Sequence, residues 1–311
     1  MRKLQQQGLP ETMINTMAKA RRDTSVSLYN CYIGKWCEFC KSKNYDFVNA
    51  TVAQGLEFLQ SLLDDGSVSR GKSPLNTAKS ALSAILVLPN GEKFGENSHV
   101  KTFMKGISNL RPARPRYLTT WDPDCILDVL GSNKWNPAAE LDLLELSMKL
   151  VTMILLATYQ RGQLILALNL DRCVILDEEI RFRILAEDVK QGSRANYVPE
   201  PVIFRKFDKP ELCIVSHLQT YLHETKDIRG DVKSVFITSR KPYKVVSRDT
   251  VSRWVKTVMC HAGVNVELFA PGSTRGASSS KAFAAGVPIE EIMKKAGWLR
   301  ESTFQKWYHR K

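Results

Sequence analysis

Residues 172–185, with the sequence RCVILDEEIRFRIL, decide the fold class of this chain. Branched and aromatic side chains lie on both sides of the polar triplet DEE, which is the pattern of two short strands joined by a tight turn. Residues 194–204 favour a third strand. Because helical patterns fill most of the chain on either side of this hairpin, we predict a mainly α protein with a small β-sheet, of the α+β class.

Before residue 110, apolar residues recur only at the three- and four-residue spacings of a helix. Four segments show this pattern: 24–40, 51–66, 73–88 and 98–108. We expect Ser73 to be the N-cap of the third segment, with Pro74 at its first helical position. Four or five helices make a small bundle, so we predict a helical domain over residues 1–110.

A stretch rich in proline and arginine, NLRPARPRYLTTWDP (109–123), follows the bundle. Its prolines exclude a regular helix, so we predict a linker over 111–121 and a second domain over 122–311. The linker arginines can contact phosphates where the chain crosses between the domains, although a solvated connector explains them equally well. These arginines are Arg111, Arg114 and Arg116.

The second domain combines the hairpin with further helices. Asp122 and Pro123 have the cap-and-proline pattern of a helix start. The longest apolar run, LVTMILLATY (150–159), is half the roughly 20 residues that a membrane span needs, and it predicts a buried helix instead. Apolar spacing predicts helices at 139–158, 208–224, 247–263, 273–286, 288–296 and 301–308.

The chain is strongly basic, with a net charge of +13 and an isoelectric point near 9.4. Basic residues exceed acidic ones by 5 before residue 110 and by 8 after it. This excess favours a polyanionic partner that contacts both halves of the chain. Charge alone also fits a basic protein that is merely soluble.

Cysteine usage and the first residues favour a soluble intracellular protein without membrane attachment. The seven cysteines are an odd number scattered through a long chain, which argues for reduced thiols. Cys37 and Cys40 have the spacing of metal ligands, but no second pair accompanies them, so we assign them to a core. The beginning of the sequence lacks the apolar stretch of a secretion signal.

Two arginines are candidates for phosphate chemistry. Cleavage of a phosphodiester without metal needs cations for the non-bridging oxygens, a nucleophile and an acid for the leaving oxygen. The planar fork of arginine suits the first task. Arg161 follows the long apolar helix, and Arg275 lies in PGSTRGASSSKAF (271–283), whose small residues would let DNA come close. Taken alone, each arginine also fits a structural role at a helix end.

Four ordered stretches resemble the tyrosine recombinase (phage integrase) family. TYQRGQLILALNL (158–170) matches the position of the first catalytic arginine, and AEDVKQGSRANYVPEP (186–201) that of the lysine between two strands. FAPGSTRGASSSKAFAAGV (269–287) matches the second arginine motif. KKAGWLRESTFQKWYHR (294–310) matches the Gly-His/Trp motif and the nucleophilic tyrosine. The similarity covers 115–311, and it is greatest to the recombinases of DIRS-like eukaryotic retroelements.

The resemblance implies roles for five residues. Tyr308 would attack the scissile phosphate and form a 3′-phosphotyrosyl link, while Arg161 and Arg275 bind the non-bridging oxygens. Lys190 would protonate the departing 5′-hydroxyl, and Trp298 would pack against the site. Because the phosphotyrosyl link conserves the energy of the phosphodiester, the resemblance implies neither a metal nor ATP nor any other cofactor.

The resemblance also implies partners and setting. Residues 1–110 look like the core-binding domain of the family, and 122–311 look like its catalytic domain. The protein would be a site-specific recombinase or integrase that acts on double-stranded DNA as a homo-oligomer, a dimer or tetramer, inserting mobile-element DNA in the nucleus. The stretch SRKPYKVVSRDT (239–250) contains the basic residues Lys241, Lys244 and Arg248. They would bind the DNA backbone, or else they belong to a solvated loop.

The sequence departs from the family pattern in three places. Gly272 replaces the histidine expected three residues before the second arginine, and Leu164 replaces the acidic residue expected three after the first. Little sequence follows Tyr308, where His309 is a weak candidate for the missing base. We therefore keep a second interpretation open, a weakened or inactive DNA-binding descendant. Type IB topoisomerases share the chemistry, but the helical N-terminal half favours a recombinase.

Overall fold

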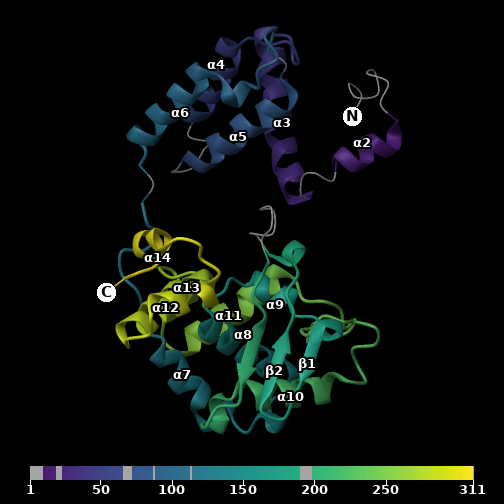
Figure 1. Ribbon diagram of the computed structural model, residues 1–311, viewed down its shortest axis with the longest axis vertical. Helices are drawn as coiled ribbons and strands as arrows, with labels where there is room; N and C mark the ends of the chain where they lie inside the picture. Colours follow the sequence, from purple (N-terminus) through teal and green to yellow (C-terminus); the bar gives the residue numbers. More distant parts are fainter. Residues whose placement is uncertain are drawn as a thin grey trace. The chain divides into compact units, whose positions relative to one another are not determined.

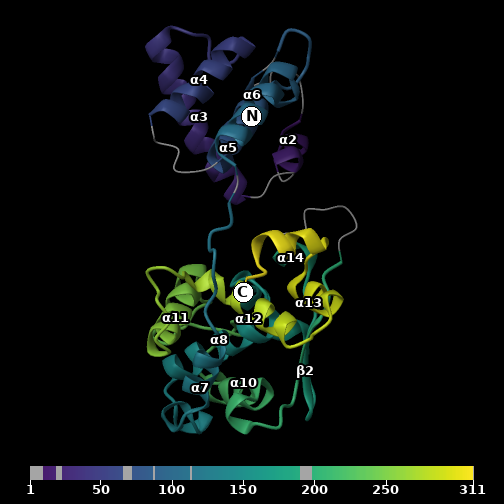
Figure 2. The same cartoon turned by 90° about the vertical axis from the view of Figure 1, so that its left-hand side faces the viewer.

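The computed structural model describes residues 10–18, 23–65, 72–86, 88–112, 114–189 and 198–310. The chain forms two compact units, Met1–Arg114 and Pro115–Lys311. Each unit has a hydrophobic core of its own and can be followed in Figure 1 and, from the side, in Figure 2.

The first unit contains α2 (Glu11–Ala18), α3 (Asp23–Lys43), α4 (Val52–Asp64), α5 (Lys72–Ile85) and α6 (Ser98–Leu110). Helices α3 to α6 bury an aromatic core. Trp36, Phe58 and Phe94 are almost fully buried. The rings of Trp36 and Phe58 meet edge to face with centroids 5.3 Å apart, a favoured aromatic geometry. The four helices predicted for this region are thus confirmed.

The start of α5 and the cysteine pair bear on two sequence predictions. The helix already includes Lys72, so Ser73 lies inside it, and the prediction that Ser73 is the N-cap was wrong. Pro74 is tolerated in this first turn because the N–H groups there have no intrahelical acceptor. Cys40 is buried in the aromatic core, which confirms its assignment, whereas Cys37 is half-buried and lies outside that core; both are free thiols.

The second unit is organised around α8, which is buried along nearly its whole length. The unit contains α7 (Asp124–Gly131), α8 (Leu143–Thr158), α9 (Gln163–Ala167), α10 (Ile214–Thr225), α11 (Arg248–His261), α12 (Thr274–Ala284), α13 (Ile289–Ala296) and α14 (Glu301–Trp307). Helices α10, α11 and α12 pack against α8. This burial on all sides explains the continuous apolar run in the sequence. Nowhere in the described parts of the chain is a helix both long and apolar enough to cross a membrane.

A small antiparallel sheet lies in the same unit. Its strands, in the order β1-β2-β3, are β1 (Cys173–Ile175), β2 (Glu179–Phe182) and β3 (Val202–Arg205). Strands β1 and β2 form the predicted hairpin, and β3 pairs with β2 so that Ile180 lies opposite Phe204. Ile180 and Phe182 are fully buried, because alternate residues of a strand face the same side. The predicted α+β class and the third strand are confirmed.

Two buried polar side chains, Lys149 on α8 and His217 on α10, lie within the second core. Lys149 donates to the carbonyl oxygen of Trp135 (2.8 Å) and to Oδ1 of Asn136 (2.6 Å). His217 is 2% exposed, and its Nδ1 lies 2.9 Å from the carbonyl oxygen of Cys213. Burial, reinforced by the Lys149 charge, lowers the pKa of His217 to about 4. The imidazole is therefore neutral in the folded protein at neutral pH.

We expect the free energy of unfolding of the second unit to decrease as the pH falls from about 6.5 to about 4. In this window the unfolded chain binds a proton at His217 that the folded protein excludes, which favours unfolding by up to about 3 kcal/mol. Urea denaturation at neutral and mildly acidic pH should show a smaller loss for His217→Gln than for the wild type. His223 is exposed on the same helix, so His223→Gln is the matched control, and equal effects of both substitutions would contradict the prediction.

Candidate active site

Four of the five residues predicted to act in catalysis meet in the second unit. Arg161 Nη2 donates a hydrogen bond to Tyr308 Oη (3.1 Å) across 147 positions of sequence. The guanidinium carbon of Arg275 lies 4.5 Å from the centroid of the Trp298 ring and 5.1 Å from that of Tyr308. The two rings themselves are 4.6 Å apart at an interplanar angle of 31°. The four side chains therefore form one contiguous cluster.

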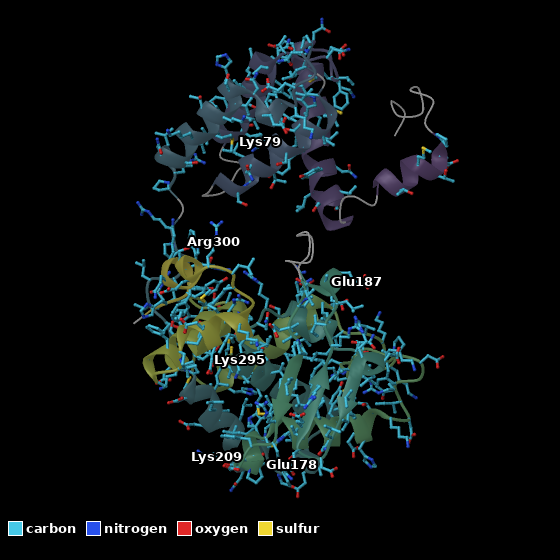
Figure 3. All side chains as sticks on the ribbon, viewed as in Figure 1. Lys79, Glu178, Glu187, Lys209, Lys295 and Arg300 are labelled. Carbon is cyan, nitrogen blue, oxygen red and sulfur yellow. The ribbon has the colours of Figure 1, made fainter. Side chains whose placement is uncertain are left out.

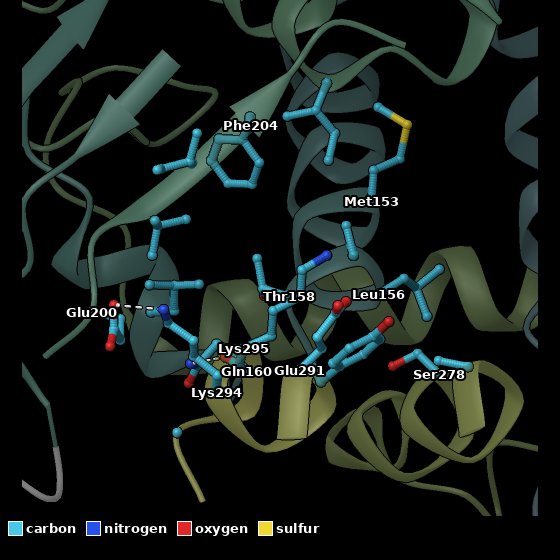
Figure 4. Close-up of a pocket in the computed structure, with 18 of the residues that line it drawn as sticks. Met153, Leu156, Thr158, Gln160, Glu200, Phe204, Ser278, Glu291, Lys294 and Lys295 are labelled. Carbon is cyan, nitrogen blue, oxygen red and sulfur yellow. Dashed lines mark hydrogen bonds and ion pairs between the residues drawn. The ribbon is translucent and has the colours of Figure 1, made fainter. Parts of the chain in front are cut away.

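Arg161 reaches the cluster because the chain turns sharply after α8. Tyr159 ends this helix with φ +54°, in the left-handed region, and it packs against the residues of α13 and α14. Gln160 then donates from Nε2 to the carbonyl oxygen of Lys295 (2.5 Å), and Figure 4 shows these two residues together. The loop that carries Arg161 is thus attached to the end of α13.

Arg275 lies in the first turn of α12 and is only 2% exposed. Its Nη2 donates to the carbonyl oxygen of Ala296 (2.9 Å), next to the carbonyl bound by Gln160. The last carbonyls of a helix lack intrahelical partners, so these two side chains complete the end of α13. Gly297 then turns back with φ +68°, a conformation that favours glycine, and this turn brings Trp298 over Arg275.

The electrostatics of the cluster favour an anion. Burial, and then the nearby charge of Arg161, lower the pKa of Arg275, which shows that its cation is poorly compensated. Neither arginine forms an ion pair with a carboxylate among the described residues. The Nε and Nη1 atoms of Arg275 and the Nε1 atom of Trp298 are buried without an acceptor. Because buried donors are nearly always satisfied, these three N–H groups indicate a site for a ligand that supplies oxygen atoms.

The position of Gly272 is open. A Cβ built there has no atom within 4 Å, and the residue lines a cavity of about 310 Å³ together with Thr120, Gly276 and Tyr308. A larger side chain at this position therefore has room beside the tyrosine. Leu164, the other departure from the family pattern, is buried in the core of the unit, where a carboxylate would be costly.

His309 is held away from the arginines. Its ring stacks on Phe304, with centroids 5.3 Å apart and nearly parallel planes, and its Nδ1 lies 2.9 Å from Gln305 Oε1. A Phe283 ring contacts it at 5.0 Å. These contacts give His309 a packing role and leave no support for it as a substitute base.

Two of the small residues after Arg275 are packed in the interior of the unit. Ser278 and Ser279 are buried, and their hydroxyls donate to the carbonyl oxygens of Thr274 and Arg275 in their own helix. Their small size lets α12 pack closely against α8. These two serines face the protein interior, whereas Gly272 and Gly276, which also flank Arg275, line the cavity beside Tyr308.

Of the remaining predicted residues, Arg116 lines the same small cavity as Tyr308. Lys190 falls outside the described residues. Arg111 follows α6 and is half-buried, and the other candidates for DNA contact are exposed. They are Arg114 and Arg116 in the segment between the units, Lys241 and Lys244 in a hairpin loop closed by the bridge between Ile237 and Val245, and Arg248 in the first turn of α11.

A second and larger cavity, of about 1350 Å³, opens beside Arg161. Figure 4 shows Leu156 and Met153 of α8 on one side and Phe204 of β3 on the other. An ion pair between Lys294 and Glu200 (3.7 Å) crosses its rim. Much of its lining is apolar, but Arg161 and Trp298 of the cluster also line it, so this cavity adjoins the anion site.

No family model matches the sequence, and no curated protein matches it. Solved structures resemble it in fold. The XerH site-specific recombinase bound to its difH substrate has a TM-score of 0.55 at 14% identity, covering 84% of this chain and 68% of that chain. The fold is that of a tyrosine recombinase. A lambda integrase dimer bound to a COC′ core site gives 0.52 at 14% identity, covering 94% and 93%. The Tn1549 transposon integrase, in complex with transposon right end DNA, gives 0.53 at 11% identity, covering 85% and 82%.

The recombinase fold also reveals residues around the cluster that sequence patterns did not indicate. Gln160 has no motif of its own, and only its place beside Arg161 hinted at a role. Ser280 belongs to a run of serines that look alike in the sequence, and Arg310 looks like one more basic residue of a basic chain. Their contacts depend on residues far away in sequence, so no local spacing predicts them.

We expect inorganic phosphate to stabilise the wild-type protein by binding at the unpaired donors. A ligand at about 100 times its Kd raises the free energy of unfolding by about 2.7 kcal/mol, which thermal denaturation detects as a higher Tm. Arg161→Gln should remove most of this shift, because it removes one of the two cations of the site. Arg161 is exposed, so the substitution leaves the core intact. Arg300→Gln is the control, because Arg300, labelled in Figure 3, is another exposed arginine of the same unit. The same phosphate shift in both variants, at matched ionic strength, would exclude a specific site.

Proposed function

We propose that this chain is a DNA strand transferase of the tyrosine recombinase type, which cuts and rejoins duplex DNA through a 3′-phosphotyrosyl intermediate without metal or ATP. One observation carries the proposal. A tyrosine hydroxyl is hydrogen-bonded to one arginine and lies beside a second, buried arginine whose remaining N–H groups have no acceptor. A nucleophile beside unpaired cationic donors is the arrangement that phosphoryl transfer needs.

The chemistry follows from these groups. The Tyr308 oxygen attacks the scissile phosphorus while its phenolic proton passes to solvent. The bond from phosphorus to the 5′-oxygen breaks, and Lys190 gives that oxygen a proton. Arg161, Arg275 and the Trp298 N–H stabilise the charge on the non-bridging oxygens. In the free protein the Tyr308 ring stacks against Trp298 and Arg275, so we infer that DNA binding turns the ring to admit the phosphate. Attack by another strand's 5′-hydroxyl reverses the step and rejoins the DNA.

The proposed substrate is double-stranded DNA, bound by a homo-oligomer, a dimer or tetramer. The net charge of +13 supports a polyanionic partner, and the structures of similar fold are a recombinase and integrases bound to DNA. We place phosphate contacts at the exposed basic residues of the connecting segment and of the loop before α11. The likeness to DIRS-like retroelement recombinases supports insertion of mobile-element DNA in the nucleus.

A second candidate function rests on Gly272. If the missing histidine has left the site inactive, the chain is a DNA-binding descendant that no longer cleaves. The open cavity beside Tyr308 is the observation that favours this reading. A general acid–base group contributes about 10²- to 10⁴-fold to a rate, so its loss is equally compatible with a slow enzyme.

A duplex with a nick near the cleavage point should distinguish the two functions. Strand transferase activity predicts a covalent protein–DNA adduct that forms with the wild type and is absent with Tyr308→Phe, because only the hydroxyl is removed. Denaturing gels resolve the adduct, and duplex affinity should be the same for both proteins. Retained binding without any adduct in the wild type would support the inactive DNA-binding protein instead.

Gly272→His should accelerate adduct formation by about 100-fold, the lower end of the range for general acid–base groups. The substitution is sterically allowed, because nothing lies within 4 Å of a Cβ at this position. The gain should depend on pH near the histidine pKa, and Gly272→Ala is the matched control that adds a Cβ without a titrating group. If both variants react at the wild-type rate, the absence of a histidine at position 272 does not limit the reaction.

A further inference from the structure

The backbone on both sides of Tyr308 is fixed by one buried serine. Ser280 is 4% exposed, and its Oγ donates to the carbonyl oxygen of Tyr308 (2.9 Å). The amide N–H of Arg310 donates to the same hydroxyl oxygen (3.0 Å). The amide of Tyr308 itself donates to the carbonyl oxygen of Phe304 (2.9 Å). The main chain is thus bound before and after the proposed nucleophile.

The guanidinium of Arg310 continues this network through carbonyl oxygens. Its Nε donates to Tyr117 (2.8 Å), its Nη2 to Lys306 (3.0 Å) and its Nη1 to His309. Three acceptors around one planar group fix its orientation, which the point charge of a lysine does not do. Arg310 has no carboxylate partner among the described residues, so its contacts depend on geometry more than on charge.

Tyr117, the distant acceptor, is itself anchored to the framework of the site. Its hydroxyl accepts a hydrogen bond from the amide of Ala270 (3.0 Å), and its ring lies 5.3 Å from that of Phe269. These residues directly precede the turn into α12, which carries Arg275. Arg310 therefore links the backbone of Tyr308 to the segment that places the buried arginine.

We propose that Arg310 is a positioning residue for the nucleophile, which acts with Ser280 to hold the Tyr308 backbone while the phenol turns toward the phosphate. The proposal rests on the proposed strand transfer. The contacts of Ser280 and Arg310 involve only main-chain atoms near Tyr308, whereas the phenol is held by Arg161 and by ring stacking. With the backbone fixed, side-chain rotation alone sets where the hydroxyl arrives. An error of about 1 Å in such placement costs about 10²-fold in rate.

Single-turnover adduct formation on the nicked duplex tests the proposal. Arg310→Ala should slow the reaction by about 10- to 100-fold, and Ser280→Ala should slow it in the same direction. Arg310→Lys keeps the charge but not the fork, so it should be nearly as slow as Arg310→Ala. Duplex affinity and the Tm shift produced by inorganic phosphate should stay within about 2-fold of the wild type, because the donors of the anion site are untouched.

The matched control is Arg300→Ala, which removes an exposed arginine eight residues before Tyr308 and should react at the wild-type rate. A wild-type rate for Arg310→Ala or Arg310→Lys would overturn the positioning role. So would a parallel loss of the phosphate shift, since that would mean collapse of the whole site. If the wild type itself forms no adduct, the proposed function fails and this inference fails with it, whereas an active wild type with an equally active Arg310→Ala overturns the inference alone.

Discussion

Arg275 carries its guanidinium into the interior of the second unit, where it donates to the carbonyl oxygen that ends α13. Burying a cation is costly unless its charge and its N–H groups are matched, and here only part of that requirement is met inside the protein. The aromatic faces of Trp298 and Tyr308 give partial compensation. The remaining N–H donors indicate that an oxyanion from outside binds here. The burial of Arg275 is therefore both a cost to folding and the basis of the binding site.

Helix ends, more than helix faces, assemble this site. The left-handed turn at Tyr159 ends α8 and brings Gln160 to the end of α13, while Gly297 turns the chain so that Trp298 covers Arg275. Carbonyl groups at helix C-termini need donors from outside the helix. At the end of α13 these donors are Gln160, the neighbour of Arg161, and Arg275 itself. The arginines are therefore held by the same contacts that complete the helices.

The sequence predicted the helices, the hairpin and the α+β class because these depend on spacing within a short window. The prediction of an N-cap at Ser73 was wrong, because the start of a helix depends on which backbone N–H groups find acceptors outside the helix. The sequence did not show that the serines after Arg275 are buried. In α12 the hydroxyls of Ser278 and Ser279 bond to carbonyl oxygens of their own helix, so these serines pack in the interior as small residues.

What the sequence by itself determined was the set of chemically able residues and their order: two arginines beside apolar helices, a tryptophan, a tyrosine, and a glycine where the pattern predicts histidine. Only the tertiary structure decided that four of them meet, that Arg275 is buried with unpaired donors, and that Ser280 and Arg310 hold the backbone of Tyr308. The physical reason is that burial and hydrogen-bond partnership are properties of contacts between distant segments. Residue type restricts which contacts are possible, but packing alone selects among them.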